Sequence, residues 1–248
     1  MVDRTYIDIA ALVAVLLLVL IHLYSAKLRF LQGVPRSRWL SIAGGASVAY
    51  VFLHLLPELS QGQQTLAGAF EVFSFVEQHV YLVALVGLAT FYGLQHMAET
   101  SRRRRREEEG KDKTSAGVFW LHMVSFAVYN LLIGYLLIHR EQKGIVSLAI
   151  FAVAMGFHFL VTDYGLGEQH KDSYHRSGRW ILSASITAGW VIGVLTEIGD
   201  VALAVLVAFL AGGVILNVLK EELPAERQSR FWAFALGAAA YGVLLIAS

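Results

Sequence analysis

Long apolar stretches recur along the chain and are separated by short polar connections. An α-helix needs about 20 mostly apolar residues to cross roughly 30 Å of hydrocarbon, and these stretches have that length. Between the sixth and seventh stretches, Gly199 and the carboxylates of Glu197 and Asp200 are poor material for a bilayer centre, so we place a turn there. We count eight spans, at about 5–26, 38–59, 78–99, 116–139, 144–164, 178–197, 199–220 and 229–247. The sequence therefore predicts an all-α polytopic membrane protein with a single transmembrane domain over residues 1–248.

Composition supports the same class. Hydrophobic residues make up 56% of the chain and its mean hydropathy is +0.58, which is too apolar for an ordinary soluble domain. The formal net charge of +1 gives no basic field for nucleic acid, so the expected partner is the lipid bilayer. With no cysteine there are neither disulfides nor thiolate ligands, and His, Asp, Glu, Asn or water must hold any metal ion.

The connections differ in positive charge, and this difference predicts the orientation of the chain. Lys and Arg are retained on the cytoplasmic side, and an external N-terminus puts 17 of the 20 basic residues inside. The largest group lies in the connection at 100–115, which we interpret as a cytoplasmic charged loop. We read the stretch 6–24 as a retained span and expect both termini outside the cytoplasm. The expected location is a plasma membrane, namely a bacterial inner membrane.

Two segments of the chain resemble each other. AGGASVAYVFLHLLPEL starts at Ala43, AGGVILNVLKEELPAE starts at Ala211, and they share AGG and a terminal LPE or LPAE. The predicted second helix runs from inside to outside and the seventh from outside to inside, so an inversion in the membrane plane relates them. Inverted repeats are typical of secondary transporters. The alternative is that small-residue motifs recur by chance because they permit close helix packing.

Eight spans, external termini, a long loop between helices 3 and 4, and the helix ends HLLPE and EELPAER together resemble the ZIP (Zrt/Irt-like) family of divalent-metal transporters. The likeness covers nearly the whole chain and is most specific over Ala43–Leu59 and Ala211–Leu245. It implies a 3+2+3 arrangement with an inverted repeat, in which the fourth and fifth helices are enclosed by the two triplets and carry the metal site.

The fourth-helix motif of that family reads like HNxPEG or HSxxDG, and the match here is YNLLIG, Tyr129 to Gly134. Asn130 is kept, whereas Tyr129 replaces the histidine and Ile133 replaces the carboxylate. Losing that carboxylate removes a charged ligand from the fourth helix.

The fifth-helix motif resembles HEIPHE, and the match here is HFLVTD. His158 is kept, Phe159 replaces the first carboxylate, Thr162 replaces the second histidine, and Asp163 takes the place of the trailing glutamate. A two-metal centre of the family type is therefore not expected.

A single weaker metal site remains, drawing on Asn130, His158, Thr162 and Asp163. His158 and Asp163 point about 140° apart on a straight helix, so only a local break would bring them together. His122 is an alternative partner, because helical rise places it at about the depth of His158. For His158, an intramembrane ionisable group, the functional interpretation competes with a neutral histidine bonded to a Tyr or Asn neighbour.

His54 and Glu58 lie near the outer end of the second helix, and Glu77 and His79 open the third helix on the same side. They are either an entrance for cations or interfacial residues that reach water at little cost. We interpret His22 as an ordinary residue near a helix end.

Two functions follow from this reading. The first is a ZIP-like carrier that moves zinc, iron or manganese into the cytoplasm; the second is a ZIP-fold membrane protein without metal transport that serves as a scaffold, a sensor or the carrier of another solute. Neither is an enzyme, and no cofactor is expected beyond the bound or transported metal. The sequence leaves a homodimer open.

Overall fold

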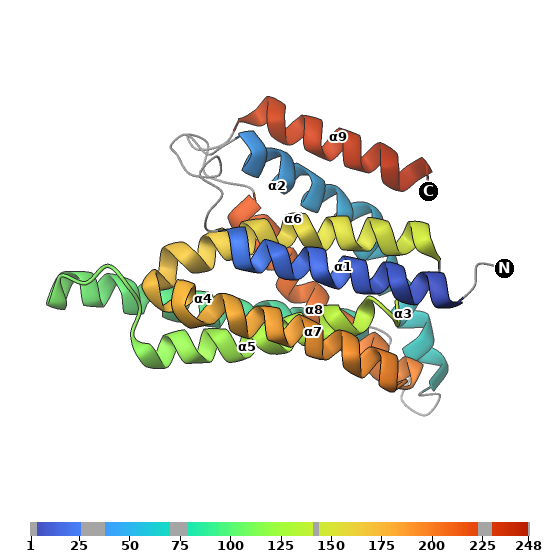
Figure 1. The fold of residues 1–248 in the computed structure, drawn as a ribbon, viewed down its shortest axis with the longest axis horizontal. Coiled ribbons are helices and arrows are strands. Elements are labelled where there is room, and N and C mark those ends of the chain that lie inside the picture. Colours follow the sequence, from blue (N-terminus) through green and yellow to red (C-terminus); the bar gives the residue numbers. More distant parts are fainter. Residues whose placement is uncertain (1–3, 26–37, 70–78, 141–143, 223–229, 248) are drawn as a thin grey trace.

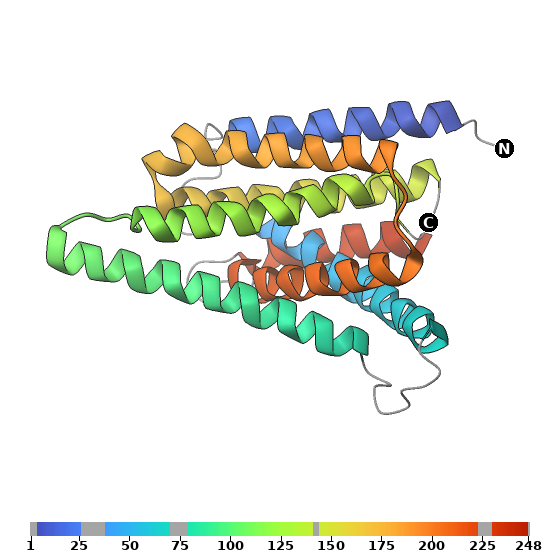
Figure 2. The same ribbon diagram turned by 90° about the horizontal axis from the view of Figure 1, so that it is seen from below.

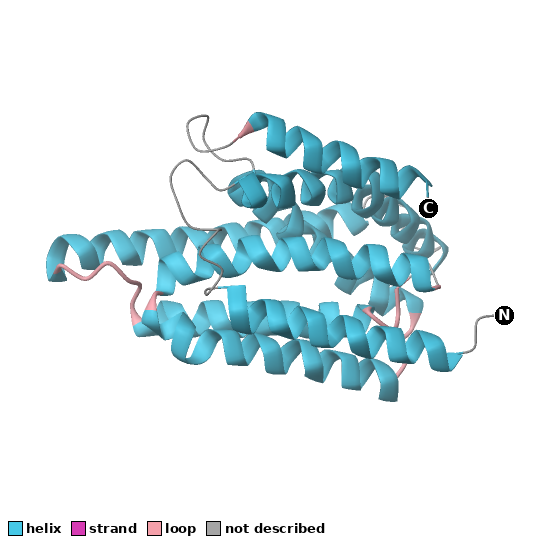
Figure 3. Cartoon of the chain, turned by 45° about the horizontal axis from the view of Figure 1, so that its top comes forward, coloured by secondary structure: helices cyan, strands magenta, loops and turns pink. Residues whose placement is uncertain are grey.

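The computed structural model describes residues 4–25, 38–69, 79–140, 144–222 and 230–247, and within these ranges the regular structure is helical, without strands (Figure 3). Most of the helices lie roughly along one long axis, whereas α3 is steeply inclined to it (Figure 1). They are α1 (Arg4–Tyr24), α2 (Arg38–Tyr50), α3 (Leu56–Ala69), α4 (His79–Glu109), α5 (Ala116–Leu136), α6 (Ile145–His170), α7 (Arg179–Leu195), α8 (Asp200–Asn217) and α9 (Phe231–Ala247). Three π-helical turns continue them: η3 (Val51–Leu55) joins α2 to α3, η5 (Tyr174–Gly178) precedes α7, and η6 (Val218–Glu222) follows α8.

The helices have the length and the surface of membrane spans. Among the described residues, seven helical segments are long and apolar enough to cross a bilayer, whereas α9 is apolar but has only 17 residues. Large apolar side chains face outward along α1 and α5, among them Leu16 (53% exposed) and Val124 (60% exposed). Such surfaces favour lipid over water. The chain is an integral, polytopic, all-α membrane protein.

The predicted spans correspond to the observed helices, with shifted ends. The predicted turn between the sixth and seventh spans is present, because α7 ends at Leu195 and α8 begins at Asp200. The largest difference concerns residues 100–109, which we expected in a charged loop and which continue α4 as helix. The ion pairs Arg104–Glu108 and Arg105–Glu109 explain this, since oppositely charged side chains four residues apart stabilise helical turns. Only the short connection from Gly110 to Ser115 separates α4 from α5.

Successive spans alternate in direction. The helices α4, α6 and α8 end at the same end of the bundle at which α5, α7 and α9 begin (Figure 1). We call this the arginine-rich end, because it carries Arg102–Arg106 in the last turns of α4. The start of α1 and the end of α9 lie together at the opposite end (Figure 1). The repeat segments in α2 and α8 therefore run in opposite directions along the bundle.

The helices form two groups (Figure 2). In one, α1 packs on α6 and α7, and α5 packs on α7; in the other, α2 packs on α9, and α4 and α3 pack on α8. Close approaches inside the second group depend on glycines: a Cβ at Gly45 would collide with the backbone of Phe234 in α9, and one at Gly212 with the backbone of Ala84 in α4. Glycine thus lets backbones meet at two crossings, α2 with α9 and α8 with α4.

These two crossings fit an inverted repeat. A relation that exchanges the second span with the seventh and the third with the eighth converts one crossing into the other, and each contains the AGG of its repeat. A π-helical turn begins about two helical turns after the start of each motif, η3 in one case and η6 in the other. The two repeats therefore share a π-helical turn that their amino-acid sequences do not indicate. The LPAE end of the second repeat lies outside the described residues.

The central helices are not equally enclosed. In the most apolar stretch of α6, 56% of the residues are buried, against 39% in that of α5. One face of α5 points outward through Trp120, Leu121, Val124 and Val128, while α6 also packs on α2 of the other group. The polar side chains of α5 that approach polar side chains of α6 accordingly lie on the inward face of α5.

Candidate functional site

Four polar side chains from three regions of the chain meet in the bundle interior, and we call them the His22 cluster: His22, Ser25, Asn130 and Asp163. All are buried, with at most 6% of any residue exposed. His22 Nδ1 lies 3.0 Å from each carboxylate oxygen of Asp163, and His22 Nε2 lies 2.8 Å from Asn130 Oδ1. The Ser25 hydroxyl donates to Asp163 Oδ2 at 3.1 Å. The cluster joins α1, α5 and α6 through a buried ion pair.

The hydrogen-bond directions define the charge of the cluster. The amide nitrogen of Asn130 donates to the backbone carbonyl of Phe126 at 2.8 Å, which a carbonyl can only accept, so Asn130 Oδ1 faces His22 as an acceptor. The other ring nitrogen of His22 faces a carboxylate, which also accepts. Nε2 therefore donates to Asn130 Oδ1, and when Asp163 is ionised Nδ1 donates as well, so that the pair is then an imidazolium and a carboxylate.

A second group, the Tyr129 cluster, contains Tyr129, His158 and Thr162. His158 Nε2 lies 2.9 Å from the Tyr129 hydroxyl and 3.3 Å from the Thr162 hydroxyl. All three residues are at least nine-tenths buried. His158 thus bonds to the tyrosine that stands where the resembled motif has histidine, and the group is uncharged when the ring is neutral.

The helix α6 shows no break between His158 and Asp163, and the two residues belong to different clusters. The expected set of Asn130, His158, Thr162 and Asp163 is therefore divided: Asn130 and Asp163 meet at His22, whereas His158 and Thr162 meet at Tyr129.

The expected pairing of His122 with His158 does not occur, because His122 faces His170. Its Nδ1 lies 3.1 Å from His170 Nε2, and its Nε2 lies 2.6 Å from the backbone carbonyl of Leu94. His170 Nδ1 in turn lies 2.6 Å from the Thr114 hydroxyl. We call this series the histidine chain: Thr114, His170, His122 and the Leu94 carbonyl.

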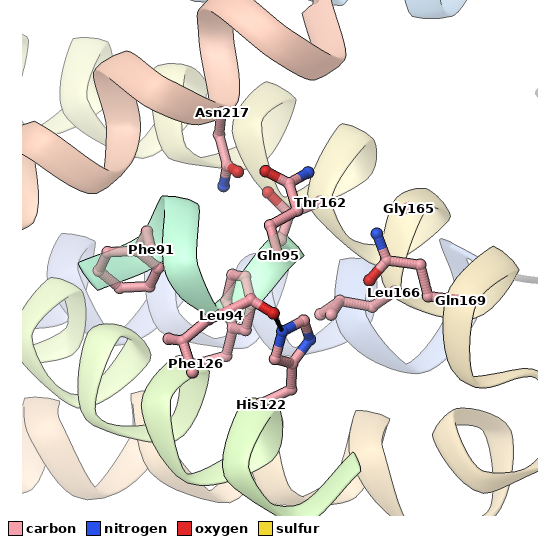
Figure 4. A pocket seen from close by; sticks show the side chains of 10 residues that line it. All are labelled: Phe91, Leu94, Gln95, His122, Phe126, Thr162, Gly165, Leu166, Gln169 and Asn217. Atoms are coloured by element: carbon pink, nitrogen blue, oxygen red, sulfur yellow. Dashed lines mark hydrogen bonds between the residues drawn. The ribbon is translucent and has the colours of Figure 1, made fainter. Parts of the chain in front are cut away.

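One wall of a small cavity is formed by His122. This amide cavity, of about 30 Å³, lies between α4, α5, α6 and α8 (Figure 4). Its other polar walls are Gln95, Thr162, Gln169 and Asn217. A cavity of this size with several polar partners has room for one or two water molecules.

A larger cavity of about 610 Å³ lies at the end of the bundle opposite the arginine-rich end. Its lining includes four carboxylates, so we call it the acidic cavity: Asp8, Glu58, Glu197 and Asp200. A narrower cavity of about 20 Å³ shares Glu58 with it and extends inward to Tyr50 and Met155. Of the two expected entrance residues on the second span, Glu58 lines this path, whereas His54 does not and stacks on Tyr50 with ring centroids 5.1 Å apart. Glu77 and the side chain of His79 lie outside the described residues.

Arg140 also lines the acidic cavity, and its guanidinium hydrogen-bonds mainly to backbone carbonyls. Its guanidinium donates to the carbonyls of Leu137 and Gly144 at 2.5 and 2.8 Å and to the Ser147 hydroxyl at 3.3 Å. Burial lowers the pKa of Arg140 from its ordinary value. The residue fastens the end of α5 to the start of α6, and among the described lining residues it is the one arginine beside four carboxylates.

Within the part of the chain that the structure describes, no three His, Asp or Glu residues lie close enough together to form a ready metal site. Two histidines that were not predicted as site residues, His22 and His170, complete two of the three polar groups. The signal for His22 was an imidazole in an apolar stretch together with an unpaired intramembrane carboxylate elsewhere, since such groups need partners. No family model, curated protein or solved structure matches this chain.

Proposed function

We propose that the chain is a secondary transporter of a divalent metal cation such as zinc, iron or manganese, with a ZIP-like architecture. In this proposal the arginine-rich end faces the cytoplasm, and the cation moves from the acidic cavity toward that end. The His22 cluster is the binding site, and its ligands are Asp163, His22 and Asn130. The proposal concerns a carrier, without a chemical reaction.

The observation that carries the proposal is the convergence of Asp163, His22 and Asn130 from three helices on one buried point. Carboxylate, imidazole and amide oxygen are ligand types used for divalent transition metals. A buried charge inside a membrane span is costly, and such groups characteristically mark ion pathways. A purely structural role would be served more cheaply by apolar packing.

Electrostatics supports an approach from the acidic cavity. Carboxylates that line a concave surface concentrate cations and speed their capture. Glu58 belongs both to this cavity and to its narrow inward extension, which ends at Tyr50, Met155 and Val214 between the two groups of helices. A cation that enters there moves along the boundary between the groups, where alternating access requires relative motion.

A second candidate function is a membrane protein of the same architecture that does not transport metal. The observation in its favour is that the His22 cluster is already satisfied, because both nitrogens of the His22 ring and both oxygens of Asp163 have partners. The ring occupies the space between Asp163 and Asn130 that a cation needs. Under the transport proposal, His22 turns aside when the metal binds; under the alternative, the ion pair is permanent.

The two are separated by reconstituting the purified protein in liposomes and measuring uptake of Zn²⁺, Mn²⁺ and Fe²⁺. Under the transport proposal at least one metal accumulates, and Asp163→Asn and His22→Gln each lower uptake by at least about tenfold. His175→Gln, at an exposed histidine, is the matched control and keeps full uptake. Absence of uptake of all three metals by the wild type would favour the second candidate.

A further inference from the structure

The histidine chain connects the arginine-rich end to the bundle interior. Thr114 lies in the connection between α4 and α5, His170 is the last residue of α6, and His122 lines the amide cavity. All three residues are at least 95% buried. Each link is a hydrogen bond of 2.6 to 3.1 Å.

The Leu94 carbonyl fixes one proton of this chain. A carbonyl only accepts, so His122 Nε2 carries a hydrogen. When both rings are neutral, His122 Nδ1 accepts from His170 Nε2, and His170 Nδ1 accepts from the Thr114 hydroxyl. The tautomers of both rings follow from this one acceptor.

One further proton fits into the chain without loss of a hydrogen bond. With it, His122 Nδ1–H donates to His170 Nε2, His170 Nδ1–H donates to Thr114 Oγ1, and His122 is the imidazolium. A hydroxyl can reverse because it both donates and accepts. Moving the Nδ1 proton of His122 across the 3.1 Å link places the same charge on His170 instead. The pair thus takes up one proton and shares its charge between the interior and the end of α6.

Of the two rings, His170 is better placed to carry the positive charge. His170 stands at the C-terminus of α6, where the helix dipole stabilises a cation. Among the described residues no carboxylate bonds to either ring, and Arg105 reaches the chain only through the carbonyl of Thr114 at 3.0 Å. Burial without a counter-ion opposes the charge. The groups that face the two rings from the packed elements are Gln95 of α4, Phe119 and Phe126 of α5, Thr162 and Gln169 of α6, and Asn217 of α8; at the same end lie the ion pairs Arg102–Asp112 and Lys171–Glu168.

We propose that the His122–His170 pair is a proton-binding site that loads from the arginine-rich end through Thr114 and presents its charge to the amide cavity. This site would also couple proton binding to cation transport, and that role rests on the proposed transport function. A proton on His122 repels a cation in the amide cavity, so the proton and a cation do not occupy the inner half of the path together. Proton binding itself does not depend on that function.

Proton binding is tested by following the ring ¹⁵N resonances of the full-length protein in lipid nanodiscs between about pH 5 and 8, with His122→Gln and His170→Gln for assignment. We expect the His122 and His170 resonances to move together through one midpoint. Thr114→Val removes the last acceptor and shifts that midpoint to lower pH, whereas Thr114→Ser retains it; this pair of variants keeps both rings in place if the glutamine variants do not fold. Rings that both stay neutral over this range, or a Thr114→Val midpoint equal to that of the wild type, would overturn the proposal.

Coupling is tested with a pH-sensitive dye inside liposomes that contain the wild type, Thr114→Val or His175→Gln. We expect metal uptake to move protons with the wild type and with His175→Gln, and this coupled flux to be lost with Thr114→Val although Zn²⁺ still binds. Equal proton movement with Thr114→Val contradicts coupling through this pair. If the wild type takes up no metal while the resonances still titrate together, the transport function fails and the proton site stands.

Discussion

His22 and Asp163 are 141 positions apart in the chain, yet the imidazole Nδ1 lies 3.0 Å from both oxygens of the carboxylate. The pair connects the first span to the fifth and is sealed from the surface, with 1% and 0% of the two side chains exposed. In such an environment each charge is tolerated only because the other is present. This dependence can be measured.

Removing both partners of this ion pair should destabilise the protein by less than the two single removals together would predict. Asp163→Asn leaves a buried imidazolium without an anion, and His22→Gln leaves a buried carboxylate, each at a cost of roughly 3–5 kcal/mol. The double variant should lose less than the sum of the single losses, by about 0.5–3 kcal/mol. Denaturation in detergent micelles, followed by circular dichroism, gives the three values. Additive losses would show that the two charges do not depend on each other.

The helices could be predicted because the length and the apolar composition of each stretch are enough to identify a membrane span. The carboxylates of Glu197 and Asp200 mark the turn before α8, and both line the acidic cavity. The end of α4 was mispredicted because charge composition suggested a loop, whereas the four-residue spacing of Arg104 with Glu108 stabilises helix. Local patterns thus decide the element type, and their spacing matters as much as their polarity.

The site was harder to predict, because helical depth alone does not fix which face a residue presents. His122 and His158 were expected to face one another at similar depth, but rotation about the helix axes turns His122 to His170 and His158 to Tyr129. His22 lies in the last turn of α1, as expected, but it is not an ordinary helix-end residue, because it is buried against Asp163 and Asn130. Hydrogen-bond partners on distant spans are set by how the helices pack, and this packing cannot be read from a single sequence.

The Tyr129 cluster makes a smaller contribution that should be separable from transport. Tyr129→Phe removes the hydroxyl that lies 2.9 Å from His158 Nε2, at a cost of about 1 kcal/mol. Thr162→Val removes the longer contact at 3.3 Å and should cost less. We expect Zn²⁺ affinity, measured by isothermal titration, to stay unchanged in Tyr129→Phe. A large loss of affinity would instead place this cluster in the metal site.

The glycines at the two crossings should not tolerate a side chain. In Gly45→Ala and Gly212→Ala the new methyl group meets backbone atoms of the facing helix, which cannot move aside as a flexible side chain can, so we expect a loss of about 1–3 kcal/mol or more. Gly93→Ala in α4 is the matched control, because nothing lies within 4 Å of its Cβ position. It should raise stability by up to about 1 kcal/mol, since alanine favours helix. Thermal unfolding in one detergent compares the three, and equal effects would mean that the crossings are looser than described.

The connection between α4 and α5 should weaken at low pH through Asp112. Arg102 donates to both carboxylate oxygens at 2.7 Å, and this hydrogen bonding lowers the pKa of Asp112 from its ordinary value of 3.8. Because the pKa is lower in the folded state, the stabilisation is complete above the unfolded-state value and is lost as the pH falls through the folded-state value. The pair is partly exposed, with 28% and 46% of the two side chains accessible, so its contribution is small, about 0.2–1 kcal/mol.

Asp112→Asn should therefore lower the melting temperature slightly at about pH 6, and the difference from the wild type should vanish below about pH 3 because protonated Asp112 no longer attracts Arg102. High salt should shrink the same difference at about pH 6, since solvent-exposed charges are screened. Glu107→Gln, which removes one negative charge from an exposed position of α4, controls for net charge and should show no such pH-dependent gap. A gap for Asp112→Asn that persists below about pH 3 would mean that the side chain acts through its shape or its neutral hydrogen bonds, and then protonation of Asp112 does not loosen the connection that holds Thr114 against His170.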